Sequence, residues 1–315
     1  MNIKNLVTQY VAFRRALGEQ CKTSEIHLRA FCRAIGPRTL ITRIRLKDVN
    51  AFLAGTGPFT NTWFRKYTAL KGAFRFAISR GELATAPLPT DLPKPLPTVT
   101  PYIYSREEIR RLLDAIPTCR RLPARIAAPT MRAILLVFYG AGLRRGEALR
   151  LTAADVDLPN SLLTVCYTKF YKSRLVPISR DLTKVLSDYA AWRRAQYPVA
   201  GANDYFFVGQ DGQAITQDTL QRAFKRLREY AGVRRSGATR LQPRMHDLRH
   251  TFAVHRLTEW YRQGADAQRL VYHLSVYLGH VSLVSTQVYL TMTPELLREA
   301  STRFERYAFR EDIHA

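Results

Sequence analysis

Apolar and polar residues follow a helical period along the first 92 positions. Apolar side chains recur every three or four residues between positions 6 and 17 and again between 26 and 35, which predicts two amphipathic helices. A third helix is expected over 61–80, with its apolar residues on one face and Lys71 and Arg75 on another. The apolar residues that recur at this spacing are Leu6, Tyr10, Phe13, Leu17, Ile26, Leu28, Phe31 and Ile35.

This pattern ends in a stretch crowded with proline. Six prolines fall between positions 87 and 101, and because proline removes a backbone donor and clashes within a helix, no continuous helix can form there. Such a segment is extended and semi-rigid. The chain is also longer than one compact core usually holds. We therefore expect a helical domain over 1–92, a linker over 93–104 and a second domain over 105–315.

The second domain is predicted to be mainly helical with one small β-hairpin. Ser105 and Glu108 have the spacing of a capping box, in which each side chain accepts the backbone N–H of the other residue. Short runs at 162–167 and 174–178 fit strands joined by residues 168–172. The helices expected here cover 131–140, 181–196, 217–231, 246–263, 266–278, 283–290 and 294–308.

Charge is the unusual feature of the composition. The chain carries 49 Lys and Arg against 25 Asp and Glu, which gives a net charge of +24. Self-repulsion of this size is relieved by a polyanion, and nucleic acid is the leading candidate because phosphate neutralisation releases counterions. A merely basic protein and a protein bound to an anionic membrane are the alternatives. The apolar content of 46% is enough for an ordinary core.

Several classes of protein are not expected from this sequence. The longest apolar stretch, 133–143, is shorter than the roughly 20 residues of a membrane span. Arg14 and Arg15 interrupt the N-terminal apolar patch too early for a signal peptide. The four cysteines are scattered without a C-x-x-C pair, which favours a reducing cytoplasm and argues against disulfides and a metal site.

Candidate chemistry gathers in the second domain. Cleavage of a phosphodiester without a metal requires fixed cations for the developing charge, an aligned nucleophile and an acid for the leaving oxygen. Arg144 directly follows the predicted apolar helix, and His246 and Arg249 share a face at the start of another helix, where the N-terminus also favours an anion. Five of the seven histidines lie between positions 246 and 280.

The motifs at these positions resemble those of the tyrosine recombinase (phage integrase) family, and most closely its Xer-like members. The matching segments are Gly-Leu-Arg-x-x-Glu at 142–147, Arg-Leu-Val-Pro at 174–177, His-x-Leu-Arg-His at 246–250 and Leu-Gly-His at 278–280. The step of nine residues from His280 to Tyr289 matches as well. The resemblance implies a helical, SAM-like core-binding domain followed by a catalytic domain.

The resemblance also implies how the scissile phosphate is held. Arg144 and Arg249 would clamp it. His246 and His280 would add hydrogen bonds and help to manage the proton of the nucleophile. Glu147 would hold one of these active-site side chains in place without contacting the phosphate itself.

The remaining parts of the reaction fall to a tyrosine and a lysine. By the resemblance, Tyr289 would become joined to the 3′ phosphate, and Lys169 would protonate the departing 5′ oxygen. Family members often have glycines beside this lysine, whereas Thr168 and Phe170 flank it here, so Lys172 remains an alternative. The family needs no metal and no nucleotide cofactor.

Partners and assembly follow from the same reasoning. The partner would be double-stranded DNA, with the two domains on opposite sides of the duplex. Four protomers would assemble on two sites through the last helix, and accessory or partner recombinases are a further possibility.

The expected function is site-specific DNA recombination. It would serve the integration or excision of a mobile element, resolution, or transposition, and the enzyme would act in the cytoplasm in association with the nucleoid. The alternatives are a type IB topoisomerase-like enzyme and a catalytically silent DNA-binding regulator. The residues expected to contact DNA are Lys71, Arg75, Arg240 and Arg244.

Overall fold

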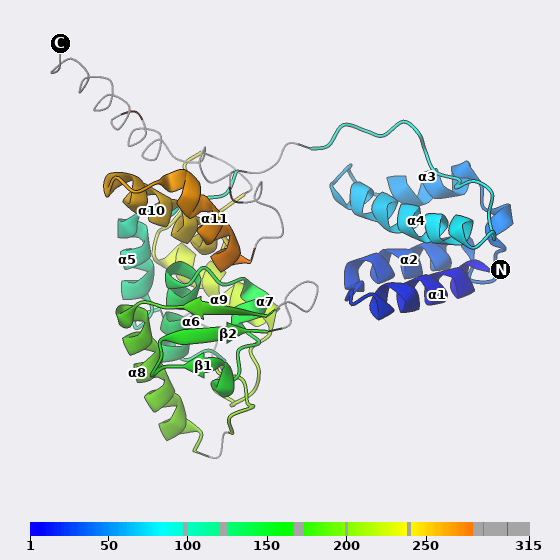
Figure 1. The fold of residues 1–315 in the computed structure, drawn as a ribbon. Helices are drawn as coiled ribbons and strands as arrows, with labels where there is room; N and C mark the ends of the chain where they lie inside the picture. Colours follow the sequence, from blue (N-terminus) through cyan, green and yellow to red (C-terminus); the bar gives the residue numbers. More distant parts are fainter. Residues whose placement is uncertain are drawn as a thin grey trace, which may run out of the picture. The chain divides into compact units, whose positions relative to one another are not determined.

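The computed structural model describes residues 1–96, 100–119, 125–166, 173–198, 201–237 and 241–279, together with residues 286 and 301. The described residues form two compact units, one within residues 1–96 and the other from residue 100 onward (Figure 1). Both units are mainly helical, and the second contains a small antiparallel sheet, which confirms the predicted fold class.

The first unit is a small helical bundle with an apolar interior. Helices α2 and α4 make its largest contact, and the rings of Phe31 and Phe74 meet edge to face across it at 6.4 Å. Leu28 and Leu6 are fully buried beside them. The helices of this unit are α1 (Ile3–Ala16), α2 (Lys22–Ile35), the 3-10 turn η1 (Ile41–Arg43), α3 (Leu46–Ala54) and α4 (Thr62–Ser79).

Three of the apolar residues that recur at helical spacing lie at the surface: Phe13, Leu17 and Ile26 are 45%, 61% and 63% exposed. Successive helical residues turn by about 100°, so Ile26 lies on the face of α2 opposite the buried Leu28. Leu17 is the C-cap residue, beyond the last turn of α1. The spacing predicted the two helices correctly, and the packing of the bundle decides which of their apolar residues are buried.

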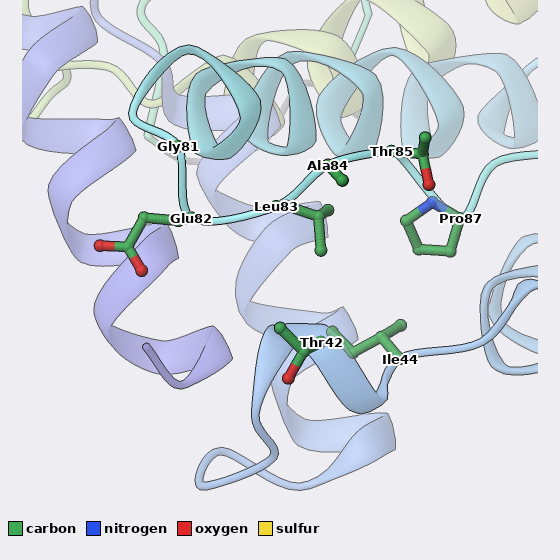
Figure 2. Close-up of a pocket in the computed structure, with 8 residues that line it drawn as sticks. All are labelled: Thr42, Ile44, Gly81, Glu82, Leu83, Ala84, Thr85 and Pro87. Atoms are coloured by element: carbon green, nitrogen blue, oxygen red, sulfur yellow. The ribbon is translucent and has the colours of Figure 1, made fainter.

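A shallow pocket of about 360 Å³ lies in the first unit, between η1 and the segment that leaves α4. Figure 2 shows the side chains of Leu83 and Ile44 on opposite walls of this pocket. Glu82 is the single ionisable side chain among its lining residues, and its carboxylate lies 3.7 Å from the amino group of Met1. The pocket therefore has no acid–base pair that could support chemistry.

The second unit is organised around helix α6, which is buried on nearly every side. Only Arg132 of its residues is exposed, and α6 contacts both α8 and α10. The capping box before α5 is confirmed, because Ser105 Oγ accepts the Glu108 N–H at 3.1 Å and the Glu108 carboxylate accepts the Ser105 N–H at 2.8 Å. The helices of this unit are α5 (Arg106–Ala115), α6 (Ala128–Gly140), α7 (Arg145–Ala148), η2 (Ala153–Asp155), α8 (Arg180–Gln196), α9 (Gln217–Tyr230), α10 (Asp247–Arg262) and α11 (Ala267–Leu278).

The predicted hairpin is present and is extended by a third strand. Strands β1 (Val156–Asp157), β2 (Leu162–Val165) and β3 (Arg174–Pro177) pair in that order and antiparallel, with Leu163 opposite Val176. β1 has only two residues, too few for an alternating pattern to reveal it. Apart from residues 286 and 301, the segments 283–290 and 294–308, where two further helices are expected, lie outside the described residues. In the part of the chain that the structure describes, no helix is long and apolar enough to cross a membrane.

Candidate active site

A glycine turn brings Arg144 to its position. The turn follows α6, and Gly142 adopts φ +60°, a conformation that favours glycine. A Cβ at this position would lie 2.7 Å from the Phe252 ring and 2.8 Å from a methyl group of Leu278. The chain can therefore pass close to α10 and α11 only because residue 142 has no side chain. Two residues later, Arg144 is the N-cap of α7.

Arg249 lies in the first turn of α10 and is buried, with a side chain only 2% exposed. Its Nη1 donates to the carbonyl of Gly142 at 2.5 Å, and its Nη2 donates to the carbonyl of Leu278 at 2.7 Å. A buried ion is tolerated only where such partners compensate for lost hydration. Arg249 thus ties the turn after α6 to the end of α11.

Arg144 contacts the same end of α11. Its Nη2 donates to the carbonyl of Gly279 at 2.8 Å, next to the Leu278 carbonyl that Arg249 uses. Its side chain is 37% exposed, so the two arginines differ in accessibility. The structure brings together two guanidinium groups that are far apart in the sequence, and it does so immediately before His280.

Glu147 is the carboxylate at the centre of this cluster, and its side chain is 3% exposed. It accepts from Arg144 Nη1 at 2.8 Å and from Arg174 at 2.8 and 3.1 Å, and Arg249 Nη1 lies 3.9 Å away. Burial alone would raise the pKa of Glu147, but the hydrogen bonds and charge of Arg174, followed by the backbone and side-chain hydrogen bonds of Arg144, lower it to about 2. Three positive charges against one negative charge leave this cluster with a charge of +2.

His246 lies directly before α10, at the protein surface. The surrounding protein atoms and then the charge of Arg249 lower the pKa of His246 to about 4, with smaller contributions from Arg244 and Arg144. The imidazole is therefore neutral near pH 7 and can accept a proton or a hydrogen bond. The ring of His250 packs edge-on against it at 4.9 Å.

Arg144 and His246 open into a cleft of about 840 Å³. Helix α9 forms one wall of it, with Gln217, Gln221 and Lys225 spaced one turn apart. Glu229 is the single acidic residue among the lining side chains, so the cleft attracts anions. The cationic residues that line it are Arg144, Arg145, Arg222, Lys225, Arg228 and Arg244.

Sequence reasoning missed the basic face of α9 and the role of Arg174. The signal for α9 was available, since Arg222, Lys225 and Arg226 recur at helical spacing between buried apolar positions. Arg174 was noticed only as part of a matching motif. Its contact with Glu147 joins two segments that are 27 residues apart, which no local pattern can reveal.

The other predicted site residues fall into two groups. Lys71 and Arg75 are exposed on α4 of the first unit, and Arg244 is 55% exposed although it pairs with Asp247 at 2.8 Å. Among the described residues, none of these three forms a hydrogen bond or ion pair with Arg144, Arg174, Arg249 or Glu147. The predicted residues that lie outside the described part of the chain are Lys169, Lys172, Arg240, His280 and Tyr289.

The described arginines thus converge beside a basic cleft, an arrangement that attracts anions. Comparison with known proteins gives the family. The model of the phage integrase family matches residues 104–295. The protein named integrase/recombinase y4rB of Sinorhizobium fredii is 34% identical over 96% of this chain and 97% of its own length. Tyrosine recombinase XerC of Chlorobaculum tepidum is 31% identical over 82% of this chain and 78% of its own.

Solved structures agree with this assignment. The XerH site-specific recombinase bound to its difH substrate is 25% identical, with a TM-score of 0.57 over 90% of this chain and 78% of that chain. The Tn1549 transposon integrase with a circular intermediate DNA shares the fold, with a TM-score of 0.72 at 18% identity over 97% of this chain and 99% of that chain. The chain belongs to the phage integrase family and is a tyrosine recombinase, an enzyme of site-specific DNA breakage and rejoining. The topoisomerase and silent-regulator alternatives are not favoured.

Proposed function

We propose that Arg144, Arg249 and His246 hold the scissile phosphate of a DNA recombination site, together with His280. The observation that carries this proposal is the convergence of Arg144 and Arg249 on consecutive carbonyl groups, those of Gly279 and Leu278. These carbonyls precede His280 directly in the chain. A net charge of +2 in the described cluster supports it, since phosphoryl transfer depends on cations fixed before the reaction.

In the proposed reaction, the Tyr289 oxygen attacks phosphorus, and the bond between phosphorus and the 5′ oxygen breaks. Lys169, or Lys172 in its place, delivers a proton to that oxygen. His246 is neutral near pH 7 because of its lowered pKa and hydrogen-bonds the phosphate or helps to take up the proton of the phenol. The resulting 3′-phosphotyrosine ester is then attacked by a second 5′ hydroxyl, which rejoins the DNA and releases the tyrosine.

A nicked suicide substrate tests this assignment. The short leaving strand diffuses away after cleavage, so the covalent protein–DNA adduct accumulates and is seen on a denaturing gel. The wild-type protein should form this adduct. Tyr289→Phe should form none, while Tyr272→Phe, which removes an exposed phenol on the nearby helix α11, should react normally. An adduct in Tyr289→Phe would refute the assignment of the nucleophile.

We further propose that both compact units bind duplex DNA and that residues 1–92 act as the core-binding domain. Lys71 and Arg75 lie exposed on one helix of the first unit, and the cleft beside α9 supplies cations in the second. The crystal structures of XerH and of a lambda integrase dimer contain bound DNA, which supports the same use here. Arg240 and Arg244 would add backbone contacts before α10.

Assembly into a tetramer on two sites is the last part of the proposal, with the C-terminal helix of one protomer packed into its neighbour. The enzyme would act in the cytoplasm on chromosomal or mobile-element DNA, with accessory or partner recombinases where direction must be set. Deletion of 293–315 should preserve binding to a single site and abolish synapsis. Unchanged recombination by the shortened protein would reject this mode of assembly.

A further inference from the structure

Arg174 at the start of β3 connects three elements of the site. Its side chain is 13% exposed. Nη2 and Nη1 donate to the two carboxylate oxygens of Glu147 at 2.8 and 3.1 Å, and Nε donates to the carbonyl of Tyr277 on α11 at 2.9 Å. β3 is thereby joined to α7 and to the last turn of α11, the two segments that carry or precede the predicted phosphate-binding groups.

The space for this guanidinium is also built into the chain. Gly279 adopts φ +67°, and a Cβ there would lie 2.8 Å from Arg174 Nη1 and 3.0 Å from its Cζ. A side chain at position 279 would therefore have to displace the guanidinium of Arg174. The glycine that precedes His280 therefore both presents its carbonyl to Arg144 and leaves room for Arg174.

The three arginines do not share Glu147 equally. Arg174 binds both carboxylate oxygens, which is the strongest arrangement for this pair of groups. Arg144 makes a single side-chain bond to the carboxylate, and Arg249 lies 3.9 Å away while donating to carbonyl groups. Carbonyl groups are neutral partners, so the net charge of Arg249 is not cancelled by them. The negative charge of Glu147 is thus met mainly by the one arginine that neither opens into the cleft nor lies in α10.

We propose that Arg174 is a positioning residue that neutralises Glu147, so that Arg144 and Arg249 keep their positive charge for the scissile phosphate. Without Arg174, the buried carboxylate would be neutralised by Arg144 and Arg249 alone, and these two arginines would stabilise less of the charge that develops on the phosphate during cleavage. The inference rests on the proposed function, because it concerns the charge available at the proposed phosphate site.

The test is a set of charge changes measured by the rate of adduct formation at saturating nicked DNA. Arg174→Gln should lower this rate by about 100-fold, the loss typical of a removed electrostatic group, while DNA affinity stays unchanged. Arg174→Lys, which keeps the charge, should recover part of the rate. The double variant Arg174→Gln, Glu147→Gln should react about tenfold or more faster than Arg174→Gln alone, because the uncompensated carboxylate is gone.

A matched control separates this effect from the general loss of a buried arginine. Arg193 on α8 is 7% exposed and donates to the carbonyl of Tyr205 at 2.9 Å, but it does not line the cleft. Arg193→Gln should cleave at the wild-type rate. Circular dichroism melting of every variant shows whether the fold is retained.

Arg174 could act on the charge at the phosphate, as proposed, or on the lysine that protonates the leaving oxygen. A substrate with sulfur in place of the 5′ bridging oxygen distinguishes these two effects. A thiolate leaves without protonation, so this substrate bypasses the lysine that would protonate the 5′ oxygen. Under the proposal, Arg174→Gln stays slow on it. Recovery by sulfur, a wild-type rate in Arg174→Gln, or a double variant as slow as Arg174→Gln would each overturn the inference. Absence of an adduct in the wild-type protein would instead count against the proposed function.

Discussion

The two compact units of this recombinase have interiors of different chemical character. Among the described residues, the buried side chains of the first unit are apolar, as in Leu28 and Phe74. The buried polar and charged side chains all belong to the second unit, and they include Glu147, Asp247 and Arg249. A buried ion pair is weak evidence for stability, since apolar residues of similar volume often stabilise a fold as well or better. The buried charges around Glu147 therefore agree with the proposed reaction, which needs cations fixed near the phosphate.

The largest effect is expected from Arg249→Ala. This change leaves the carbonyls of Gly142 and Leu278 without their donor and removes one of the three cations around Glu147. We expect the free energy of unfolding to fall by about 3–5 kcal/mol and adduct formation to cease. Denaturant unfolding and the suicide substrate measure the two effects. A stable and active Arg249→Ala protein would show that the buried charge of Arg249 is needed neither for stability nor for cleavage, which would contradict this comparison of the two units.

A fall in pH should lower the free energy of unfolding of the second unit, because Glu147 becomes protonated. Its pKa is lowered to about 2 in the fold, from an ordinary value of 4.5. A carboxylate with a lowered pKa contributes stability above its unfolded pKa, and this contribution is lost as the pH falls from about 4.5 toward 2. The loss amounts to about 3 kcal/mol.

Glu147→Gln provides the comparison for this prediction. The variant should be less stable than the wild type at neutral pH, and the difference should shrink as the pH falls through that window. Unfolding by urea between neutral pH and pH 3 measures it. A difference that does not change with pH would show that the charge of Glu147 contributes nothing to stability.

His246 should titrate far below an ordinary histidine. The surrounding protein atoms and then the charge of Arg249 lower its pKa to about 4, so the folded protein favours the neutral ring. The contribution of His246 to the free energy of unfolding is fully present above pH 6.5 and is lost as the pH falls toward 4. An NMR titration of the imidazole resonances in the free protein should show this value. Arg249→Lys, which keeps the positive charge, is the control. A His246 titration midpoint near 6.5 in the wild-type protein would contradict the electrostatics of the site.

Much of the second unit was predictable because its signals are local. The capping box of Ser105 and Glu108 is a pattern of four residues, and the helix that carries His246 and Arg249 follows from spacing. The sharing of Glu147 by Arg144 and Arg174 was not predictable, since it depends on how α7, β3 and α11 pack. The same holds for the burial of Arg249, because helical spacing does not reveal which distant segments enclose a side chain.

The smallest effect is expected from surface charges of the first unit. Lys71→Ala and Arg75→Ala should each lower DNA affinity and reduce the slope of its salt dependence by about 1, as for the loss of one phosphate contact. The cleavage rate at saturating DNA should not change, because these residues lie outside the arginine cluster. Lys225→Ala, on the wall of the cleft, is the matched change in the second unit. Identical affinity and salt slope in the Lys71 and Arg75 variants would show that this surface does not bind DNA.

Peptide mapping of the covalent adduct tests the central claim most directly. The wild-type adduct is digested with protease and nuclease, and the peptide that retains a nucleotide 3′ phosphate is sequenced by mass spectrometry. The account predicts that the phosphate is attached to Tyr289 and that Arg144→Ala and Arg249→Ala yield no modified peptide. Attachment to another residue, such as Tyr272 or Tyr277, or an undiminished yield without either arginine would contradict it.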